Sequence, residues 1–481
     1  MQGGDEYMSA YGVLLVVLNV ALGATIAIVS TVMSKKHLDK QENYFTAGRN
    51  VKTALMIATF ISYAVGTGLL FAPAESAYTT GLTAMIGYAL AISAAYIVFI
   101  PVSVRIRKLI PEGHTIGEYA KTRYGPVMYF VTLVTTTVYM FILFASNLTG
   151  AVLAFKYVGG IPILISVLVV GIPTIYFSTR GGVSAAIFSN GLQSILITPF
   201  LIIPAVFVLL HFQGAGAVYN AVLSEKPAYL DIFNGSGMEF AIMIIIAVCS
   251  AELLNQTLWQ RVYSAKSHKV IKRSLLASAI MVFPMTIIAA FFGLAAFAVN
   301  VEVPHTSVVA ALVVNGSVPV WASTIFLLVI MLGASSTGGD ALSGFSSIFS
   351  LDIVGSIFPK LTEKKPVLVA QVGCLILGAG GMIVAYFQPS ILFLLLLADL
   401  LASATVVPII AGLYSNKISG VMAAIATIAG IAAGLPIFFT IGELYSFLTA
   451  ILVSSGIILI AHLTGKKQYD YERLKTEIKS L

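Results

Sequence analysis

Long runs of apolar residues, separated by short polar segments, fill almost the whole chain. A helix that crosses the hydrocarbon core of a bilayer needs about 20 mainly apolar residues. Runs of that length predict thirteen spanning helices, and therefore an all-α integral membrane fold. The weakest division is at Gln388 and Pro389, where these two residues are the only break. The predicted spans cover residues 11–33, 51–76, 83–104, 127–155, 162–178, 183–212, 237–260, 274–300, 319–350, 366–387, 389–413, 418–440 and 443–464.

The basic residues predict an orientation for these spans. Loops on the cytoplasmic side of a membrane protein collect Lys and Arg. With the N-terminus outside, all of the 27 Lys and Arg residues except Lys156 and Lys226 fall in inner segments. Losing one span in the middle would reverse every later loop and destroy this pattern. We therefore expect a multi-pass protein of the cell membrane, plasma or inner, with a cytoplasmic tail at 466–481.

Composition supports a chain whose main partner is the lipid bilayer. Hydrophobic residues make up 58% of the 481 positions and charged residues 10%, whereas soluble domains carry about 25% charged residues. The net charge of +7 could suit nucleic acid, but its placement in inner loops favours orientation in a membrane, so no nucleic-acid partner is expected. Cys249 and Cys374 lie in apolar runs and are interpreted as buried small hydrophobes. No obligatory protein partner is evident.

The motifs of other functional classes are missing from the sequence. It contains no GxxxxGK[ST] phosphate loop and no HExxH pair, and its six histidines are scattered, mostly near loops and span ends. The first ten residues carry Asp5 and Glu6 but no basic residue, so we interpret the first apolar run as a retained helix and not as a secretory signal. These features favour a carrier over an ATP-driven pump, an enzyme or a receptor.

The second predicted span is interrupted by small residues. Residues 62–68 read Ser-Tyr-Ala-Val-Gly-Thr-Gly, and Pro73 follows. Broken helices are tolerated in a membrane only where they line a cavity, so they indicate a transport site. Close helix packing at small residues is the alternative. Because Pro73 lies on the same segment, we favour unwinding near Gly66, Thr67 and Gly68.

Two further spans carry polar residues that are costly in a bilayer. The seventh contains Glu252, Asn255 and Gln256, which need partners or water. It lies five spans after the interrupted one, as expected for five-plus-five inverted repeats whose broken first helices face each other. The ninth contains Gly333-Ala-Ser-Ser-Thr-Gly-Gly-Asp340. The hydroxyls there could bind a hard cation such as sodium or bond back to their own helix, but Asp340 marks function by default.

Two other carboxylates lie within or near spans. Glu75 could sit at the outer end of its span, where solvation is easy. Asp399 lies deeper, in the stretch LLLLADLLASA, and either a helix-packing role or part of a proton path would explain it. The sequence does not separate these two interpretations.

Four segments, in the same order along the chain, resemble those of the sodium:solute symporter family. Residues 43–49, NYFTAGR, are similar to the YFLAGR-type entry to the first core helix. Residues 115–125, TIGEYAKTRYG, are similar to the TLPEYLEKRFG-type inner loop. Residues 255–267 resemble the NQ….QR….AKS stretch, and residues 336–352 match the spacing of the ST….SS….D signature. Each match is weak alone, but together they are quite specific.

The resemblance implies the leucine-transporter fold and symport of a small-molecule substrate driven by a sodium gradient through alternating access. Ten core helices would occupy 43–413, with inverted repeats at about 51–212 and 237–413. Residues 1–42 would precede this core, and two peripheral helices at 414–465 would follow it. Sodium would bind the backbone carbonyls of Ser62 and Val65 (or of Ala58 and Ile61, if the helix start is the anchor), the carbonyl of Gly333 and the hydroxyls of Ser336 and Thr337. Substrate would lie beside Gly66, Thr67 and Gly68, facing Glu252, Asn255 and Gln256.

One position departs from the family pattern. Many members carry an Asp in the fifth core helix, within a TDVLQ-like segment that supports sodium binding. This chain has Asn190 at that position. We hypothesise that Asp340 replaces the lost carboxylate from the facing helix, so that Asn190, Gly339 and Asp340 form a second ion or coupling site. Proton coupling through Asp340 is the alternative.

The substrate is poorly constrained by the sequence. No Arg or Lys is expected deep in a span, so a bidentate clamp on an anionic group is missing, although a carboxylate could still bind at a helix N-terminus. We therefore expect a small neutral or zwitterionic solute, with sodium as the coupling ion. A proton-coupled or uncoupled carrier of urea, an amino acid or a short monocarboxylate is the alternative.

Overall fold

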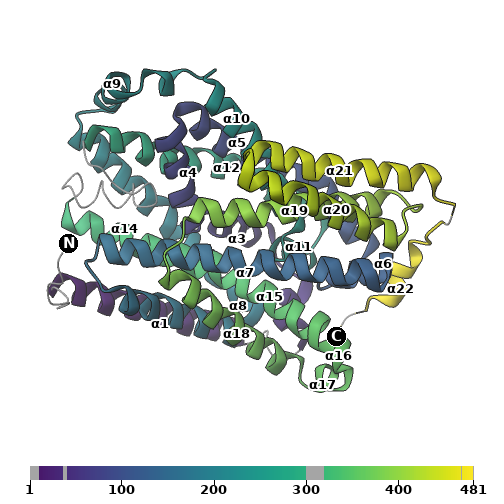
Figure 1. Cartoon of the computed structure of the whole chain (residues 1–481). Coiled ribbons are helices and arrows are strands. Elements are labelled where there is room, and N and C mark those ends of the chain that lie inside the picture. Colours follow the sequence, from purple (N-terminus) through teal and green to yellow (C-terminus); the bar gives the residue numbers. More distant parts are fainter. Residues whose placement is uncertain (1–9, 36–40, 300–318, 467, 480) are drawn as a thin grey trace.

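The computed structural model describes residues 10–35, 41–299, 319–466, 468–479 and 481. Within these ranges the secondary structure is helical, apart from one isolated bridge between Val51 and Ala265. Most of the long helices lie side by side in one bundle (Figure 1). The elements are α1 Ala10–Lys35, α2 Gln41–Thr46, η1 Ala47–Arg49, α3 Thr53–Ala64, α4 Thr67–Thr80, α5 Leu82–Leu109, α6 Ile116–Tyr124, α7 Pro126–Tyr157, α8 Ile163–His211, α9 Ala215–Glu225, η2 Pro227–Leu230, α10 Gly235–Leu254, α11 Gln256–Ser264, α12 His268–Ala295, η3 Ala296–Val299, α14 Val320–Gly333, η6 Ala334–Gly338, α15 Gly339–Ser347, η7 Ile348–Val354, α16 Gly355–Ile357, α17 Pro359–Lys364, α18 Pro366–Tyr386, α19 Ile391–Tyr414, α20 Gly420–Thr440, α21 Glu443–Thr464 and α22 Glu472–Glu477.

The all-α membrane class predicted from the sequence is confirmed over the described residues. Ten helices are long and apolar enough to cross a membrane, or eleven when α3 and α4 count as one bent span. Helix α8 bends at Gly182 (φ 53°, ψ −149°), between the predicted fifth and sixth spans. A shorter apolar stretch, Gly12–Thr25, lies in α1. The count of thirteen spans and the inverted repeat stay predictions.

Several expectations need a correction of their bounds or fall outside the described ranges. The predicted span 237–260 ends early, because α10 stops at Leu254. The ninth predicted span runs on to Ile357, since α14 to α16 form one continuous helix. Residues 1–9, 36–40 and 300, on which parts of the predicted outer terminus, first inner loop and eighth span fall, lie outside the described residues.

Short loop helices are set by local signals that hydropathy does not detect. Helix α6 starts with a capping box, in which Thr115 accepts from the Glu118 amide and Glu118 bonds back to the amide of Thr115. It ends at Gly125, whose φ of 83° suits glycine, and Pro126 then opens α7. At these residues the chain turns sharply from the polar helix α6 into the apolar helix α7.

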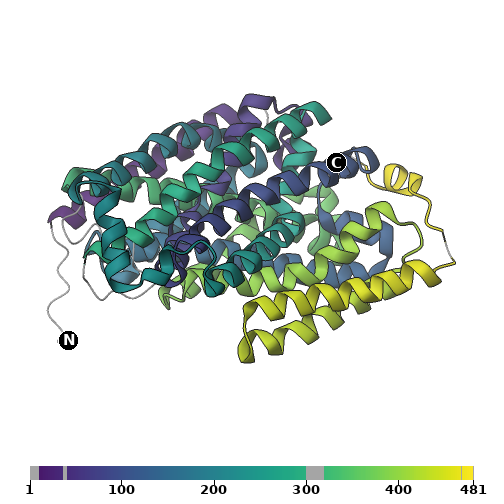
Figure 2. The same cartoon turned by 90° about the horizontal axis from the view of Figure 1, so that it is seen from above.

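The polar interior lies where the interrupted helices meet the longest ones. Helix α15 packs on α7, α8, α11 and α18, while α19 packs on α4, α7 and α10. Helices α20 and α21 pack on each other and on α19, and they lie at one edge of the molecule in both views (Figures 1 and 2). These helices therefore surround the buried polar side chains of the interior.

Candidate functional site

The second span is broken at Val65 and Gly66, within the stretch that the sequence predicts to unwind. Helix α3 ends at Ala64, Gly66 is extended (φ −78°, ψ 179°), and α4 continues at an angle of 49°. A Cβ atom at Gly66 would collide with the side chains of Thr337 and Asn147. The predicted break is therefore confirmed, and glycine is required there because two other helices approach the backbone.

A second break separates α10 from α11. Asn255 is extended (φ −67°, ψ 113°), and its side chain accepts a hydrogen bond of 2.9 Å from the Thr257 amide, which caps α11. The Gln256 side chain accepts from the Ile116 amide and donates to the His114 carbonyl, both at 2.9 Å. Gln256 thus ties α11 to the segment before α6 and lies away from the first break.

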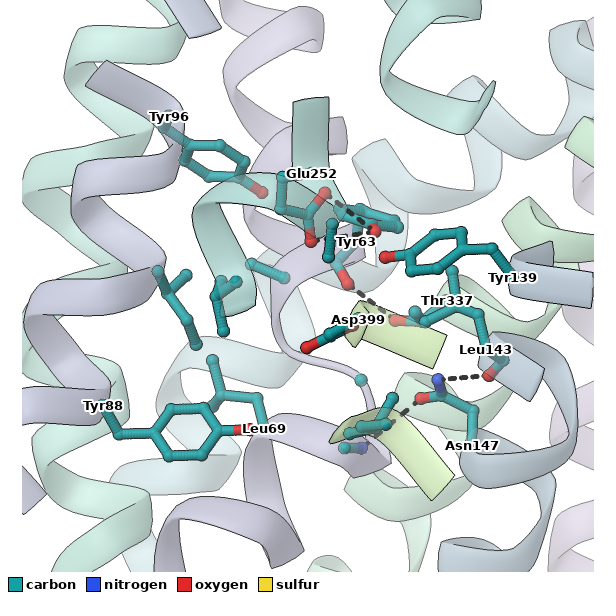
Figure 3. Close-up of a pocket in the computed structure, with 17 residues that line it drawn as sticks. Tyr63, Leu69, Tyr88, Tyr96, Tyr139, Leu143, Asn147, Glu252, Thr337 and Asp399 are labelled. Carbon is teal, nitrogen blue, oxygen red and sulfur yellow. Dashed lines mark hydrogen bonds between the residues drawn. The ribbon is translucent and has the colours of Figure 1, made fainter. Parts of the chain in front are cut away.

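A small cavity lies beside the first break. Its volume is about 90 Å³, which suits a small solute. Its walls come from α3, α4, α5, α7, α10, α19 and the η6 turn, as Figure 3 shows for the labelled side chains. The lining residues are Tyr63, Ala64, Gly66, Gly68, Leu69, Tyr88, Ile92, Tyr96, Tyr139, Leu143, Asn147, Val248, Ala251, Glu252, Thr337, Leu395 and Asp399.

Glu252 on α10 is held in position by its neighbours at the edge of this cavity. The Tyr63 hydroxyl lies 3.1 Å from each of its two carboxyl oxygens, and Asn255 donates to Oε2 at 3.1 Å. The Asn255 amide nitrogen also contacts the Tyr63 hydroxyl. Asn255 therefore acts behind the cavity wall, where it orients Glu252 and Tyr63.

Asp399 on α19 faces the same cavity but lacks such support. Its residue is 5% exposed, and no hydrogen bond to its carboxyl group is found among the described residues. Figure 3 shows this carboxyl and that of Glu252 directed into one space from different helices. No hydrogen bond of its carboxyl group therefore supports a helix-packing role for Asp399.

The hydroxyls of the ninth span meet the end of α3. Ser336 Oγ lies 2.7 Å from Ser62 Oγ and donates to Asn190 Oδ1 at 3.0 Å. Thr337 Oγ1 donates to the Tyr63 carbonyl at 2.7 Å. Both hydroxyls lie on η6, a π-helical turn within an otherwise α-helical span, a distortion that is common at functional sites. The structure thus brings together oxygens from two interrupted helices.

Asp340 belongs to a buried ion pair just beyond these hydroxyls. Arg261 Nη2 lies 2.5 Å from Asp340 Oδ2, which also accepts from Asn190 Nδ2 at 2.8 Å. Both side chains of the ion pair are almost inaccessible. Thr59 Oγ1 accepts from Asn190 at 3.1 Å and from Arg261 Nε at 3.3 Å. Arg261 lies on α11, which follows the spanning helix α10, and its side chain is nevertheless buried inside the bundle.

A second cluster of charges lies outside the spans, before α6. His114, which is fully buried, contacts Glu42 Oε2 at 2.9 Å and Glu118 Oε1 at 3.2 Å, and Arg49 lies 2.7 Å from Glu42 Oε1. Burial lowers the pKa of His114, but the two carboxylates outweigh it and raise this pKa to about 9. Burial raises the pKa of Glu42, yet the hydrogen bond and charge of His114 lower it to about 2.

The site residues named from the sequence fall into several places. Gly66, Gly68, Glu252 and Thr337 line the cavity, and Thr67 bonds to Asn147 beside it. Asn255 and Gln256 lie behind or below that wall. Ser62, Val65, Gly333 and Ser336 lie at the break, and Asn190 and Asp340 belong to the ion-pair cluster. Gly339 precedes Asp340 but faces Phe177 and Ser178 of α8.

Sequence reasoning misses Arg261, Asn147 and the four tyrosines that line the cavity. It places Arg261 in an inner loop, because the predicted span 237–260 ends directly before this residue. The neighbours Leu258, Trp259 and Val262 are apolar and fully buried, and this flanking pattern is the available signal. Asn147 is enclosed in α7 and accepts from Thr67 Oγ1 at 3.1 Å and from the Gly68 amide at 3.4 Å. A single polar residue in an apolar run carries too little information.

Glu75, the remaining carboxylate of interest, lies on α4 outside the cavity lining. It is 8% exposed, and Ser390 Oγ lies 3.3 Å from its Oε1. The expectation of a solvated outer end is therefore wrong for this side chain, since α19 begins against it.

Comparisons with known proteins give a family and a fold. The sequence model of the "Sodium:solute symporter family" matches residues 44–430. A solved structure described as "Substrate-bound outward-open state of a Na+-coupled sialic acid symporter reveals a novel Na+-site" superposes with a TM-score of 0.78 at 16% identity, covering 96% of this chain and 99% of that one. This likeness shows the fold, which is that of leucine-transporter-type symporters.

Two curated proteins are similar over most of this chain. The "Urea active transporter" of Saccharomyces cerevisiae is 23% identical over 451 residues, which is 85% of this chain and 61% of the relative. The "Urea-proton symporter DUR3" of Oryza sativa subsp. japonica is 20% identical over 460 residues, 85% of this chain and 63% of the relative. The chain thus spans less than two thirds of the length of these relatives.

Proposed function

The chain belongs to the sodium:solute symporter family, and we propose that it couples the transport of a small neutral or zwitterionic organic solute to sodium by alternating access. Membership in a family of multi-pass membrane transporters is what the comparisons establish; its relatives are carriers and not enzymes. The observation that carries the finer proposal is the cavity at the α3–α4 break, which joins a broken span to two carboxyl groups.

The solute is proposed to bind in this cavity beside Gly66, Thr67 and Gly68, with Glu252 facing it. Asn255 and Gln256 would act indirectly, by holding Glu252 and α11. The relatives are named for urea, which makes urea the first solute to test. An amino acid or a short monocarboxylate is the alternative.

Sodium is proposed to bind at the end of α3. The last turn of a helix leaves carbonyl groups without intrahelical partners, and α3 ends beside Ser336 and Thr337. The backbone of Gly333 approaches the Val65 carbonyl closely. Oxygens of these kinds are the ligands that hard cations prefer. The residues present therefore fit a sodium site made of Ser62, Val65, Gly333, Ser336 and Thr337, the set that the family resemblance implies.

The second ion site, proposed at Asn190, Gly339 and Asp340, has a competitor within the protein. The Arg261 guanidinium already balances Asp340 at 2.5 Å. A second sodium ion there would have to displace that group. We propose that Arg261 takes the place of a second bound cation and that one sodium ion drives transport.

Proton coupling is the second candidate. It is favoured by the two carboxyl groups in the cavity and by the name of the rice relative, a urea-proton symporter. The proton would bind Asp399 or Glu252, the two carboxyl groups that line the cavity.

The remaining proposals concern topology. We propose an N-terminus outside and a cytoplasmic C-terminus in the cell membrane, because this orientation puts nearly all basic residues inside. The core would span 43–413 with repeats at 51–212 and 237–413. The position of α20 and α21 at one edge of the bundle agrees with a peripheral role for 414–465.

Uptake into proteoliposomes tests the coupling. Purified full-length protein is reconstituted, and uptake of labelled urea is measured with an inward sodium gradient, with an inward proton gradient, and with neither. The proposal expects faster uptake, above protein-free liposomes, with the sodium gradient alone. Acceleration by protons alone, or equal rates in all three conditions, contradicts it.

Two glycine variants test the place of the site. A methyl group at Gly66 would press on Thr337 and Asn147, whereas one at Gly456 on the peripheral helix α21 would meet nothing within 4 Å. Overpacking of this kind costs roughly 1–3 kcal/mol. Gly66→Ala should therefore lose most of its uptake, while Gly456→Ala keeps most of it. Equal losses, with both proteins folded, count against a site at the break.

A further inference from the structure

Two acidic side chains line the cavity. Among the described residues that line it, Glu252 and Asp399 are the only charged ones, and they come from α10 and α19. The Arg261 guanidinium lies 5.7 Å from the centroid of the Tyr63 ring, and it is already paired with Asp340. The charge of these two carboxyls is thus not balanced by any side chain that lines the cavity.

Asp399 is the more informative of the two. Its residue is almost fully buried, its carboxyl group is directed into the cavity, and it has no hydrogen-bonding partner among the described residues. A buried polar group without a partner costs about 1–3 kcal/mol, and more when it is charged. The cavity that this carboxyl group faces gives access to such a partner, which can be water, an ion or a ligand.

The groups around Asp399 limit the kind of ligand. Glu252 and Asp399 line the same cavity, so a third negative charge in this space would be disfavoured. Both carboxylates accept hydrogen bonds, which O–H and N–H groups can donate, and the bonds are strongest from N–H groups that carry positive charge. Four tyrosine rings, those of Tyr63, Tyr88, Tyr96 and Tyr139, complete the walls and suit a flat or cationic group.

The positive end of a broken helix does not restore an anion site. The α4 N-terminus faces the cavity, but the Gly68 amide donates to Asn147 Oδ1 at 3.4 Å, and the Thr67 hydroxyl donates to the Asn147 carbonyl at 2.6 Å. Asn147 therefore occupies part of the donor set that a carboxylate ligand would need. The carboxyl groups of Glu252 and Asp399 remain as the charged acceptors of the cavity.

We propose that the cavity selects a small solute with N–H donors on two sides, such as an amide, urea or guanidinium group, and excludes small carboxylates. One N–H group donates to Asp399 and another to Glu252, while the tyrosine rings cover the faces of the solute. This inference rests on the proposed function in one respect, that the cavity is the transport site. It also removes the monocarboxylate from the list of solutes.

Equilibrium binding to the wild-type protein tests the selection without any variant. Acetamide and acetate have nearly the same shape but differ in donors and charge, and guanidinium adds a positive charge. Binding of each labelled compound to the purified full-length protein is measured with and without sodium. Saturable binding of acetamide and guanidinium, each at least about tenfold tighter than acetate, supports the proposal. Equal or tighter binding of acetate, or saturable binding of none of the three, overturns it.

Two matched variants then assign the selection to Asp399. Asp399→Asn keeps the shape of the side chain and removes its charge, so guanidinium binding should weaken by about tenfold or more. Glu75→Gln is the control, because Glu75 is also a buried carboxyl that contacts the start of α19 but lies outside the lining. It should leave the Kd unchanged. An unchanged Kd for guanidinium in Asp399→Asn overturns the proposal. This holds also if the variant loses only proton-driven uptake, because Asp399 would then be a proton site.

The two proposals can fail separately. If uptake shows no sodium dependence while acetamide still binds more tightly than acetate, the coupling proposal fails and the substrate class stands. If sodium drives uptake but acetate binds as well as acetamide, the substrate class fails and the symporter stands.

Discussion

Two buried carboxyl groups in the interior of this carrier differ in how their charge is balanced. Asp340 on α15 is paired with Arg261 at 2.5 Å and accepts from Asn190 at 2.8 Å. Asp399 on α19 is also enclosed but faces a cavity and has no partner among the described residues. A carboxylate that the protein balances itself can hold helices together, whereas one left without a donor is placed to receive something from outside.

The energetic consequences of these two arrangements also differ. Removing one partner of a buried ion pair leaves an uncompensated charge, which is strongly destabilising. Removing the charge of an unpartnered carboxyl relieves a desolvation cost and should affect the fold little, while affecting what binds there. Stability and ligand binding should therefore respond in opposite ways at the two residues.

The largest expected effect is that of Arg261→Met. This change leaves Asp340 without its cation in a buried setting, so the free energy of unfolding should fall by roughly 3–5 kcal/mol. The apparent melting temperature of the purified protein and the yield of monodisperse protein measure it. Arg180→Met is the control, because Arg180 is exposed and stacks on Tyr176.

The double variant Arg261→Met with Asp340→Asn separates charge balance from packing. Both charges are absent, and the side-chain amide that Asp340→Asn introduces can still bond to its neighbours, so most of the lost stability should return. If the double variant is less stable than Arg261→Met alone, the pair is not held by its opposite charges, and the contrast with Asp399 loses its basis.

The next effect concerns the exchange of carboxylate and amide between α8 and α15. Asp340→Ala should abolish ion-driven uptake and leave Arg261 unpaired. Asn190 and Arg261 both contact Thr59 and Asp340. A carboxylate at position 190 could therefore reach the Arg261 guanidinium. Asp340→Ala with Asn190→Asp should recover about 1–3 kcal/mol of stability and part of the uptake.

The exchange is tested by comparing that double variant with Asn190→Asp alone. The single variant adds a second carboxylate beside an intact Asp340 and should lose stability through repulsion. Failure of the double variant to regain either stability or uptake, with folded protein in hand, would show that the two positions are not equivalent.

Much of the fold, and part of the site, could be predicted from the sequence for physical reasons. Hydropathy and basic loops report which segments lie in lipid, and small residues with Pro73 report where a span can unwind. The proximity of Asn190 and Asp340, which lie 150 positions apart, is predicted only through the family resemblance, and it is confirmed by a hydrogen bond of 2.8 Å.

The rest depends on side-chain direction, which hydropathy does not encode. Asn255 and Gln256 lie three and four positions after Glu252, yet only Glu252 lines the cavity, because the chain turns at Asn255. Arg261 follows a span directly, as a loop residue would, and its burial is set by the packing of α11 on α15. No local pattern separates these cases.

The smallest expected effect concerns a third group of carboxylates, in which the cation that balances them loses its charge at high pH. His114 outside the spans is held between Glu42 and Glu118, beside Arg49, and its pKa is raised to about 9. An unfolded histidine titrates near pH 6.5. The stability from protonated His114 is therefore fully present below about pH 6.5 and is lost as the pH rises through about 9.

A difference between two pH profiles isolates this contribution. The apparent melting temperature of the wild type should fall between about pH 7 and pH 10 by more than that of His114→Gln, with a difference of the order of 1 kcal/mol in stability. His211→Gln, at an exposed histidine, should follow the wild type. Glu42 stays ionised throughout, because its pKa of about 2 lies far below this range. Parallel profiles for wild type and His114→Gln would show that the cluster is held by neutral hydrogen bonds. The carboxyl groups outside the bilayer would then not be stabilised by the charge of His114 in the way that Asp340 is by that of Arg261.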